Sequence, residues 1–212
     1  MFRSIFRPYG LVWTVLNTIT DVVGLTLCWL VCCLPIVTVF PATAALYDAV
    51  VHGIRYREEG PYKRFFRTFR AEWKSGILST LLWGAVLGFF GYLLAVLLTM
   101  ARQDSGFSLY AGVYLAGMLL PIGAACWSAA IISRFTFSFL ALTGTAVRFV
   151  IAHFFRSLGI AACTVALAVF TWNYPIWIFA APACLMLLWS VFAEPVFAKY
   201  GAAITPVTPD ED

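Results

Sequence analysis

Four ionisable side chains and one amide lie inside long apolar stretches of the sequence, at Asn17, Asp21, Asp48, His52 and Glu194. Ionisable groups are costly inside a membrane, so they are candidate functional residues by default. Asp48 and His52 are four residues apart, and a helix would place them on one face, where they can share a hydrogen bond or exchange a proton. The alternative is that the four ionisable groups lie near the cytoplasmic ends of their helices and meet headgroups or water.

The sequence has no motif of a known catalytic site. It contains no glycine-rich phosphate loop, no His-Glu-x-x-His and no Gly-x-Ser-x-Gly. His52 and His153 are the two histidines, and neither has Cys or carboxylate partners at the spacing of a metal site. We therefore predict a protein that is not an enzyme and holds no metal or cofactor. An intramembrane enzyme acting on lipid is the least supported class.

The composition indicates that lipid surrounds most of this chain. Hydrophobic residues make up 62% of the sequence and charged residues 11%, whereas soluble domains carry roughly 25% charged residues. Charge is absent from four long stretches, each able to hold the roughly 20 apolar residues of a membrane-spanning helix: 22–47, 75–101, 105–133 and 157–193. We predict an all-α, polytopic membrane helical bundle, with residues 1–200 as one domain and 201–212 as a disordered acidic tail.

Breaks in the apolar stretches divide them into about six spans. Pro35 and Pro41 predict a tight bend in the first stretch, because each proline lacks a backbone donor. The helix after the bend, about 41–57, is short, so it either spans or forms the returning arm of a re-entrant hairpin. Polar turns at 101–108 and 172–175 separate the later spans. The six spans are expected at about 11–34, 41–57, 75–100, 109–132, 157–170 and 176–196.

Two segments combine aromatic and basic residues and are expected to lie in the membrane interface. In 62–74 the rings recur at helical spacing and are expected to face the acyl chains, with the cations on the opposite side: Lys63, Arg64, Arg67, Arg70 and Lys74. This basic elbow could bind anionic lipid or a cytosolic partner, or only fix the topology. A second elbow is expected after a break at 143–145. Nucleic-acid binding is not expected, because the cations are few and tied to the membrane plane.

The distribution of Lys and Arg predicts which side faces the cytoplasm. With six crossings and a cytoplasmic N-terminus, 13 of the 14 basic residues lie inside and Arg102 alone lies outside. Both termini are then cytoplasmic, and the expected location is a bacterial cell membrane.

Residues 34–38 and 41–47 contain a motif in which prolines, threonine and small residues recur: Pro35, Thr38, Pro41, Ala42, Ala45 and Leu46. With the segments 62–70 and 196–200, this motif resembles the YesL-like family of bacterial membrane proteins, a domain of unknown function, over nearly the whole chain. Val39 and Phe40 depart from the small residue expected before Pro41, which predicts a different packing of the bend. Members are typically encoded near carbohydrate importers of the ATP-binding cassette (ABC) type, so the resemblance implies an accessory role in sugar uptake.

Two functions remain open from the sequence. The first is a non-enzymatic accessory or regulatory component of carbohydrate uptake, with ABC importer subunits and the anionic bilayer as partners. The alternative is a small-solute transporter or channel, for which the proline bend and the Asp48/His52 pair are the motivation. Gly84, Gly88 and Gly91 could allow close helix packing with another subunit or within the chain.

Overall fold

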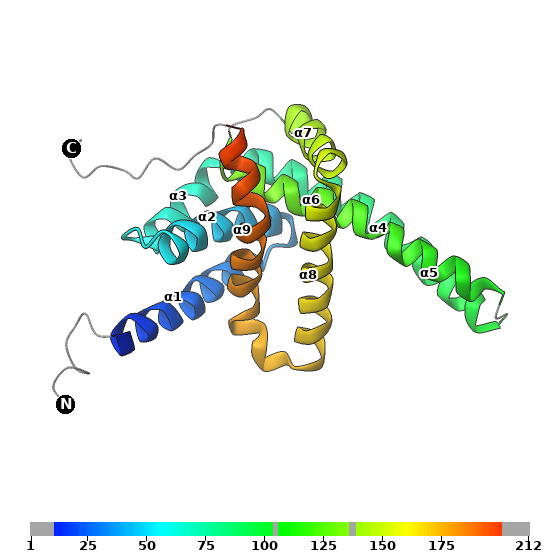
Figure 1. The fold of residues 1–212 in the computed structure, drawn as a ribbon, viewed down its shortest axis with the longest axis horizontal. Coiled ribbons are helices and arrows are strands. Elements are labelled where there is room, and N and C mark those ends of the chain that lie inside the picture. Colours follow the sequence, from blue (N-terminus) through cyan, green and yellow to red (C-terminus); the bar gives the residue numbers. More distant parts are fainter. Residues whose placement is uncertain (1–10, 104–105, 136–138, 201–212) are drawn as a thin grey trace.

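The computed structural model describes residues 11–103, 106–135 and 139–200, and every regular element in these ranges is a helix (Figure 1). Short 3₁₀ segments occur at Ile36–Thr38 (η2) and Pro175–Phe179 (η4), and a π-helical turn at Val51–Arg55 (η3). The α-helices are α1 (Leu11–Cys32), α2 (Val39–Val50), α3 (Pro61–Ala71), α4 (Trp73–Gln103), α5 (Phe107–Gly117), α6 (Leu119–Ile132), α7 (Phe139–Ala152), α8 (Phe154–Asn173) and α9 (Ala181–Lys199). The predicted all-α class is confirmed. The tail at 201–212 lies outside the described residues.

Five helical stretches are long and apolar enough to cross a membrane, which confirms the multi-span architecture. They are Ile36–Arg55, Trp73–Arg102, Phe107–Ile132, Phe154–Asn173 and Ala181–Lys199. The first predicted span corresponds to α1, whose stretch Leu16–Cys32 is also apolar but shorter. The stretch Ile36–Arg55 is mostly buried within the protein, so α2 is a central helix of the bundle.

The proline bend between α1 and α2 is present. The Thr38 hydroxyl lies 2.6 Å from the carbonyl oxygen of Pro35 and 2.5 Å from that of Cys32, so its one proton is shared between an acceptor in the bend and one at the end of α1. Pro41 lies in the first turn of α2 rather than at its first residue, where its missing N–H has no helical partner to lose. A β-carbon at Gly76 of α4 would come within 2.6 Å of Pro41, so the glycine permits α2 and α4 to approach closely.

The predicted break at 143–145 is wrong, because α7 runs through it. The hydroxyls of Thr143 and Thr145 donate to carbonyls one turn earlier in the same helix, at 3.1 and 2.7 Å, and therefore do not compete with the helix. The chain breaks instead at His153, whose φ and ψ are −124° and 47°. The second basic elbow is thus divided between α7 and α8. The last span also begins later than predicted, at Ala181, because η4 occupies the preceding turn.

The first basic elbow forms α3, as predicted, but its rings do not all face outward. Gly60, with φ of 74°, and Pro61 at the first helical position start the helix. Phe65 is fully buried because α3 packs along α2. Phe66 and Trp73 are exposed. The expectation that these rings face the acyl chains is therefore wrong for Phe65.

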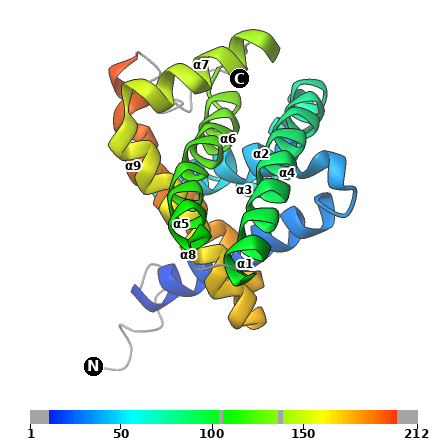
Figure 2. The ribbon, with the colours of Figure 1, turned by 90° about the vertical axis from the view of Figure 1, so that its right-hand side faces the viewer.

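The helices form a bundle from which one hairpin projects. α2 packs against α1, α3, α4, α6 and α9. The distal part of α4 pairs with α5 in an antiparallel hairpin that extends well beyond the other helices (Figure 1) and points toward the viewer in Figure 2. The Tyr114 hydroxyl donates to the Phe90 carbonyl at 3.1 Å and ties the two helices together. We call this part of the structure, residues 88–103 and 107–117, the α4–α5 arm.

Candidate functional site

A buried ion-pair network joins α2, α3, α6 and α9, and His52 lies at its centre. Nδ1 of His52 is 3.0 Å from both the main-chain oxygen and Oδ1 of Asp48. The other ring nitrogen, Nε2, is 2.8 Å from Nη2 of Arg64 and 3.0 Å from Nη1 of Arg134. The side chains of His52 and Asp48 are only 3% and 4% exposed. The imidazole therefore bridges a carboxylate on its own helix and guanidinium groups from two others.

The Asp48 carboxylate is held mainly by α3. Its Oδ2 accepts from Nε of Arg64 at 3.0 Å and from the Thr68 hydroxyl at 2.7 Å. Arg64 also donates from Nη1 to Glu58 at 2.8 Å. The Arg64 side chain is 23% exposed, so it forms the outer edge of the network. These contacts fasten α3 onto α2.

Glu194 of α9 forms the second half of the network. Its Oε1 accepts from Nη2 of Arg134 at 2.7 Å and from the Tyr47 hydroxyl at 2.9 Å. The Tyr56 hydroxyl lies 3.4 Å from Oε2, and burial together with Glu194 raises the pKa of that phenol. One helical turn before Glu194, Ser190 accepts from Nη1 of Arg55 at 2.7 Å. The C-terminal half of α9 is therefore anchored to α2 and to the end of α6.

The hydrogen bonds define the tautomer of His52. Guanidinium groups only donate, so Nε2 must accept from Arg64 and Arg134 and carries no proton. The proton lies on Nδ1 and points toward Asp48. In aspartate–histidine catalytic dyads the second ring nitrogen is free to act as the base toward a nucleophile. Here Arg64 and Arg134 occupy that atom.

The formal charges in the network balance, with three carboxylates against three guanidinium groups when His52 is neutral. Balanced pairing is needed because an uncompensated charge in a buried site costs several kcal/mol. The groups are Asp48, Glu58 and Glu194, and Arg55, Arg64 and Arg134.

A π-helical turn places His52 and Arg55 in the network. The helix widens at Val51–Arg55, where the N–H of Tyr56 donates to the Val51 carbonyl at 3.0 Å. π-turns are rare and are frequent at functional sites. The turn is followed by Arg57, whose φ is 57°, and by Gly60, whose φ is 74°. The chain thereby reverses and returns as α3 beside the network.

The sequence located part of this site. The structure brings together Asp48, His52 and Glu194 from the five predicted polar residues. Asn17 is exposed, and Asp21 lies by Tyr62 of α3, whose pKa is raised by burial and then by that carboxylate. Sequence reasoning missed Arg134, Tyr47 and Ser190. Sequence reasoning also placed Arg64 with the exposed cations, and that placement is wrong, because Arg64 turns inward to Asp48. The other cations of the elbow are exposed: Lys63, Arg67, Arg70 and Lys74.

An apolar cavity of about 1070 Å³ adjoins the network, bounded by α1, α2, α4, α6, α8 and α9. Its mouth includes Ile36 and Trp172, which are 80% and 87% exposed. Because these lining residues are exposed, the cavity is open, and molecules from the surrounding bilayer can enter it.

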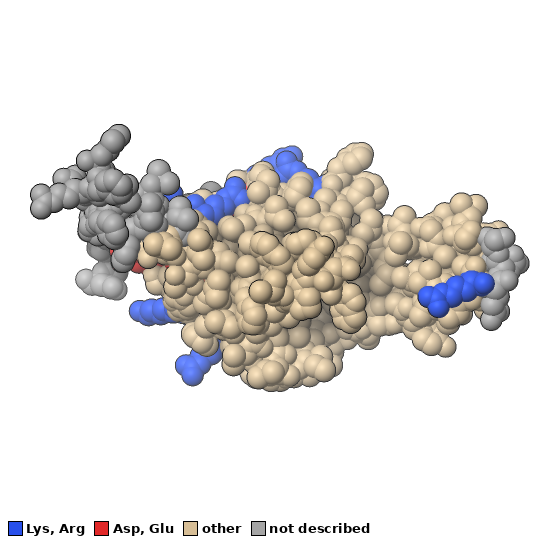
Figure 3. Space-filling model, turned by 90° about the horizontal axis from the view of Figure 1, so that it is seen from below, with Lys and Arg blue, Asp and Glu red and all other residues tan. Residues whose placement is uncertain are grey.

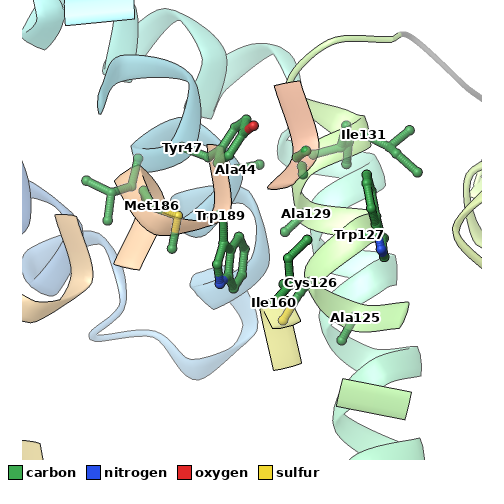
Figure 4. Close-up of a cluster of buried hydrophobic side chains, with 14 of the residues drawn as sticks. Ala44, Tyr47, Ala125, Cys126, Trp127, Ala129, Ile131, Ile160, Met186 and Trp189 are labelled. Atoms are coloured by element: carbon green, nitrogen blue, oxygen red, sulfur yellow. The ribbon is translucent and has the colours of Figure 1, made fainter. Parts of the chain in front are cut away.

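A layer of buried side chains separates the cavity from the ion pairs. Figure 4 shows Trp189 and Met186 of α9 facing Tyr47 and Ala44 of α2, with Cys126 of α6 on the other side of Trp189. The Tyr47 hydroxyl reaches through this layer to Glu194. The same three helices therefore border both features: one part of α2, α6 and α9 lines the cavity, and the neighbouring part lies beside the ion pairs.

No metal centre is formed within the described residues: nowhere in them do three or more His, Cys, Asp or Glu side chains lie close enough to hold an ion. The six cysteines are unpaired.

Comparison with known proteins identifies the family of the first half of the bundle. Residues 22–97 match the family model described as "Protein of unknown function, DUF624". This part of the chain is a DUF624 domain, of the YesL-like family. The match includes α2, α3, the proline bend and five ionisable residues of the network, Asp48, His52, Arg55, Glu58 and Arg64. Arg134 and Glu194 come from later in the chain. No curated protein and no solved structure matches the chain.

Proposed function

We propose that this DUF624 protein is a non-enzymatic accessory or regulatory subunit of an ABC-type carbohydrate importer, with the α4–α5 arm contacting membrane helices of the importer. The observation that carries the proposal is the arm itself. It is apolar, it projects from the bundle, and the helical stretch Trp73–Arg102 is almost unburied by the rest of the chain. A membrane helix of another subunit can therefore pack along it without rearranging the bundle.

The surface of the arm suits helix–helix packing in lipid. Gly88 and Gly91 share a face of α4, and a β-carbon built at either meets no atom within 4 Å. The same holds for Gly112 and Gly117 of α5. Membrane helices associate through small residues that let their backbones approach closely. No other part of the described chain packs closely against these glycines, which supports a contact with another protein at this surface.

The buried polar groups favour this role over transport by the chain itself. Asp48, His52 and Glu194 were the residues that motivated a transporter or channel, and all three are engaged in ion pairs and hydrogen bonds within the network. The adjoining cavity is walled almost entirely by apolar side chains. Sugar binding needs several hydrogen-bonding groups directed into the site. A buried network whose charged groups are paired with one another suits a structural brace for a subunit interface.

The exposed cations of α3 extend the proposal to the bilayer surface. Lys63, Arg67, Arg70 and Lys74 project from one side of the elbow, and each cation near an anionic leaflet contributes about 1 kcal/mol. We place this elbow at the cytoplasmic face of a bacterial cell membrane, with both termini on that side. The arrangement would orient the arm relative to the bilayer.

Co-purification from bacterial membranes tests the proposal. A C-terminally tagged protein extracted in mild detergent should recover importer permease subunits in near-stoichiometric amount by mass spectrometry. The variant Gly88→Leu/Gly91→Leu should lose at least nine-tenths of that recovery, because its side chains block close approach. Gly144→Leu is the matched control, since Gly144 also meets no atom within 4 Å but lies on α7. Recovery of the wild-type protein alone would contradict the proposal.

A further inference from the structure

We propose that the cavity between α1, α2, α4, α6, α8 and α9 is a binding site for one acyl chain of a membrane lipid or fatty acid. The proposal rests on the chemistry of the cavity wall and on the position of its mouth. It does not depend on the accessory role.

Most hydrogen-bonding side chains of the wall are already satisfied by the protein, apart from Trp172 at the exposed mouth. Three indole N–H groups donate to hydroxyls: Trp29 to Thr43 at 3.2 Å, Trp83 to Ser128 at 3.0 Å and Trp189 to Thr164 at 3.0 Å. The hydroxyls in turn donate to carbonyls one helical turn earlier, for Thr43, Thr80, Thr164, Thr171 and Ser128. No indole donor of these three residues remains to bind a polar ligand.

Because few polar groups of the wall are left to bind a ligand, the cavity favours an apolar occupant. An ordered water needs two to four polar partners, and a sugar needs several directed donors and acceptors. The wall offers few hydrogen-bond donors or acceptors for either ligand, because aliphatic and aromatic carbon lines the cavity, at residues such as Leu30, Leu87, Leu167 and Leu185. A hydrocarbon chain makes no hydrogen-bond demand. It is also the most abundant apolar molecule around a membrane protein.

The mouth of the cavity is placed for lipid to enter. It lies at the α1–α2 bend and the α8–α9 turn, where Ile36, Trp172 and Ile178 are exposed. Figure 3, viewed from the end of the bundle that bears the α8–α9 turn, shows a surface whose centre is free of Lys, Arg, Asp and Glu. Uncharged, apolar rims allow a chain to slide in from the bilayer. The ion-pair network and the Tyr47–Trp189 layer close the opposite end.

Filling the cavity from its wall tests the site. Gly84 lines the cavity and has no atom within 4 Å of a built β-carbon, so Gly84→Trp starts from an unobstructed position and directs an indole at the cavity. Ala168→Trp does the same from α8. Gly144→Trp on α7 is the control, since Gly144 is equally unobstructed and does not line the cavity.

Native mass spectrometry of delipidated protein with dioleoylphosphatidylglycerol measures the occupancy. We expect about one acyl-bearing molecule per wild-type and Gly144→Trp chain, and at least a tenfold loss of occupancy in both filled variants. The mass of the ligand retained before delipidation distinguishes a phospholipid from a free fatty acid. A wild-type protein that binds none, or filled variants that bind as the wild type does, would overturn the site.

A second measurement uses the wild-type protein alone, in case the filled variants do not fold. A diazirine-bearing oleate is photolysed with the delipidated protein in mild detergent, and the labelled residues are mapped by peptide mass spectrometry. Labels should concentrate on cavity-lining residues such as Cys126 and Met186. Labels confined to the outer faces of α4 and α5 would refute the assignment.

Discussion

Arg134 and Glu194 lie 60 residues apart in the sequence, yet Nη2 of the arginine is 2.7 Å from Oε1 of the glutamate. The two side chains are 6% and 7% exposed. This pair connects the end of α6 to the C-terminal half of α9, and through His52 and Tyr47 it reaches α2. The ion-pair network thus holds the later helices onto the DUF624 domain.

Removing one partner of this pair should destabilise the protein strongly. Arg134→Met leaves Glu194 buried without its cation, which costs about 3–5 kcal/mol. The double variant Arg134→Met/Glu194→Leu removes both charges, and we expect it to regain at least half of that loss. Chemical unfolding in detergent, followed by tryptophan fluorescence, measures both free energies. A double variant less stable than the single one would contradict the pairing.

Position 52 should tolerate a neutral acceptor and reject a cation. His52→Gln keeps an oxygen that can accept from the arginines, and we expect a loss of about 1–2 kcal/mol. His52→Lys places an ammonium between two guanidinium groups and should cost about 3–5 kcal/mol. Equilibrium unfolding of the two variants compares them directly. Equal losses would show that the ring contributes packing and no accepting atom.

The α3 cations should separate into one structural residue and several surface residues. Arg64→Gln leaves Asp48 and Glu58 without their shared partner and should lower the free energy of unfolding by about 2–4 kcal/mol. Arg67→Gln, three residues further along the helix and exposed, should change it by less than about 0.5 kcal/mol. The same unfolding measurement applies, and a larger effect at Arg67 than at Arg64 would contradict the structure.

His153 should introduce a pH dependence in the weakly acidic range. Burial first, and then Arg156 and Lys199, lower the pKa of this imidazole. The unfolded chain then binds more protons than the folded one just below pH 6.5, so stability falls as pH decreases through that range. His153→Gln should flatten this part of the stability–pH curve. An unchanged slope in the variant would assign the dependence to other groups.

Cysteines placed at the end of α4 and at the end of α9 should react with a labelling reagent from opposite sides of the membrane. In a background where the native cysteines are replaced, Lys199→Cys should react with an impermeant maleimide only after the cells are opened. Arg102→Cys should react in intact cells, because it lies in the last turn of α4, at the end of the apolar stretch. Labelling of both positions from the same side would overturn the assigned topology.

The sequence predicted the elements of this fold better than their contacts. The pairing of Asp48 with His52 follows from their spacing, and the bend follows from Pro35 and Pro41. The partners Arg64 and Arg134 could not be predicted, because a basic residue near an interface is ordinarily exposed and only tertiary packing turns it inward. The break expected at Thr143–Thr145 failed because threonine hydroxyls can bond within a helix.

We propose that the α4–α5 arm contacts another membrane protein. The most direct test places a photo-crosslinking amino acid at Gly91 of the arm, with Gly144 as the control position, and irradiates intact bacterial membranes. We predict an adduct between the Gly91 variant and an importer permease, identified by mass spectrometry, and none from Gly144. Crosslinks from Gly91 only to lipid or to a second copy of this chain would contradict the account.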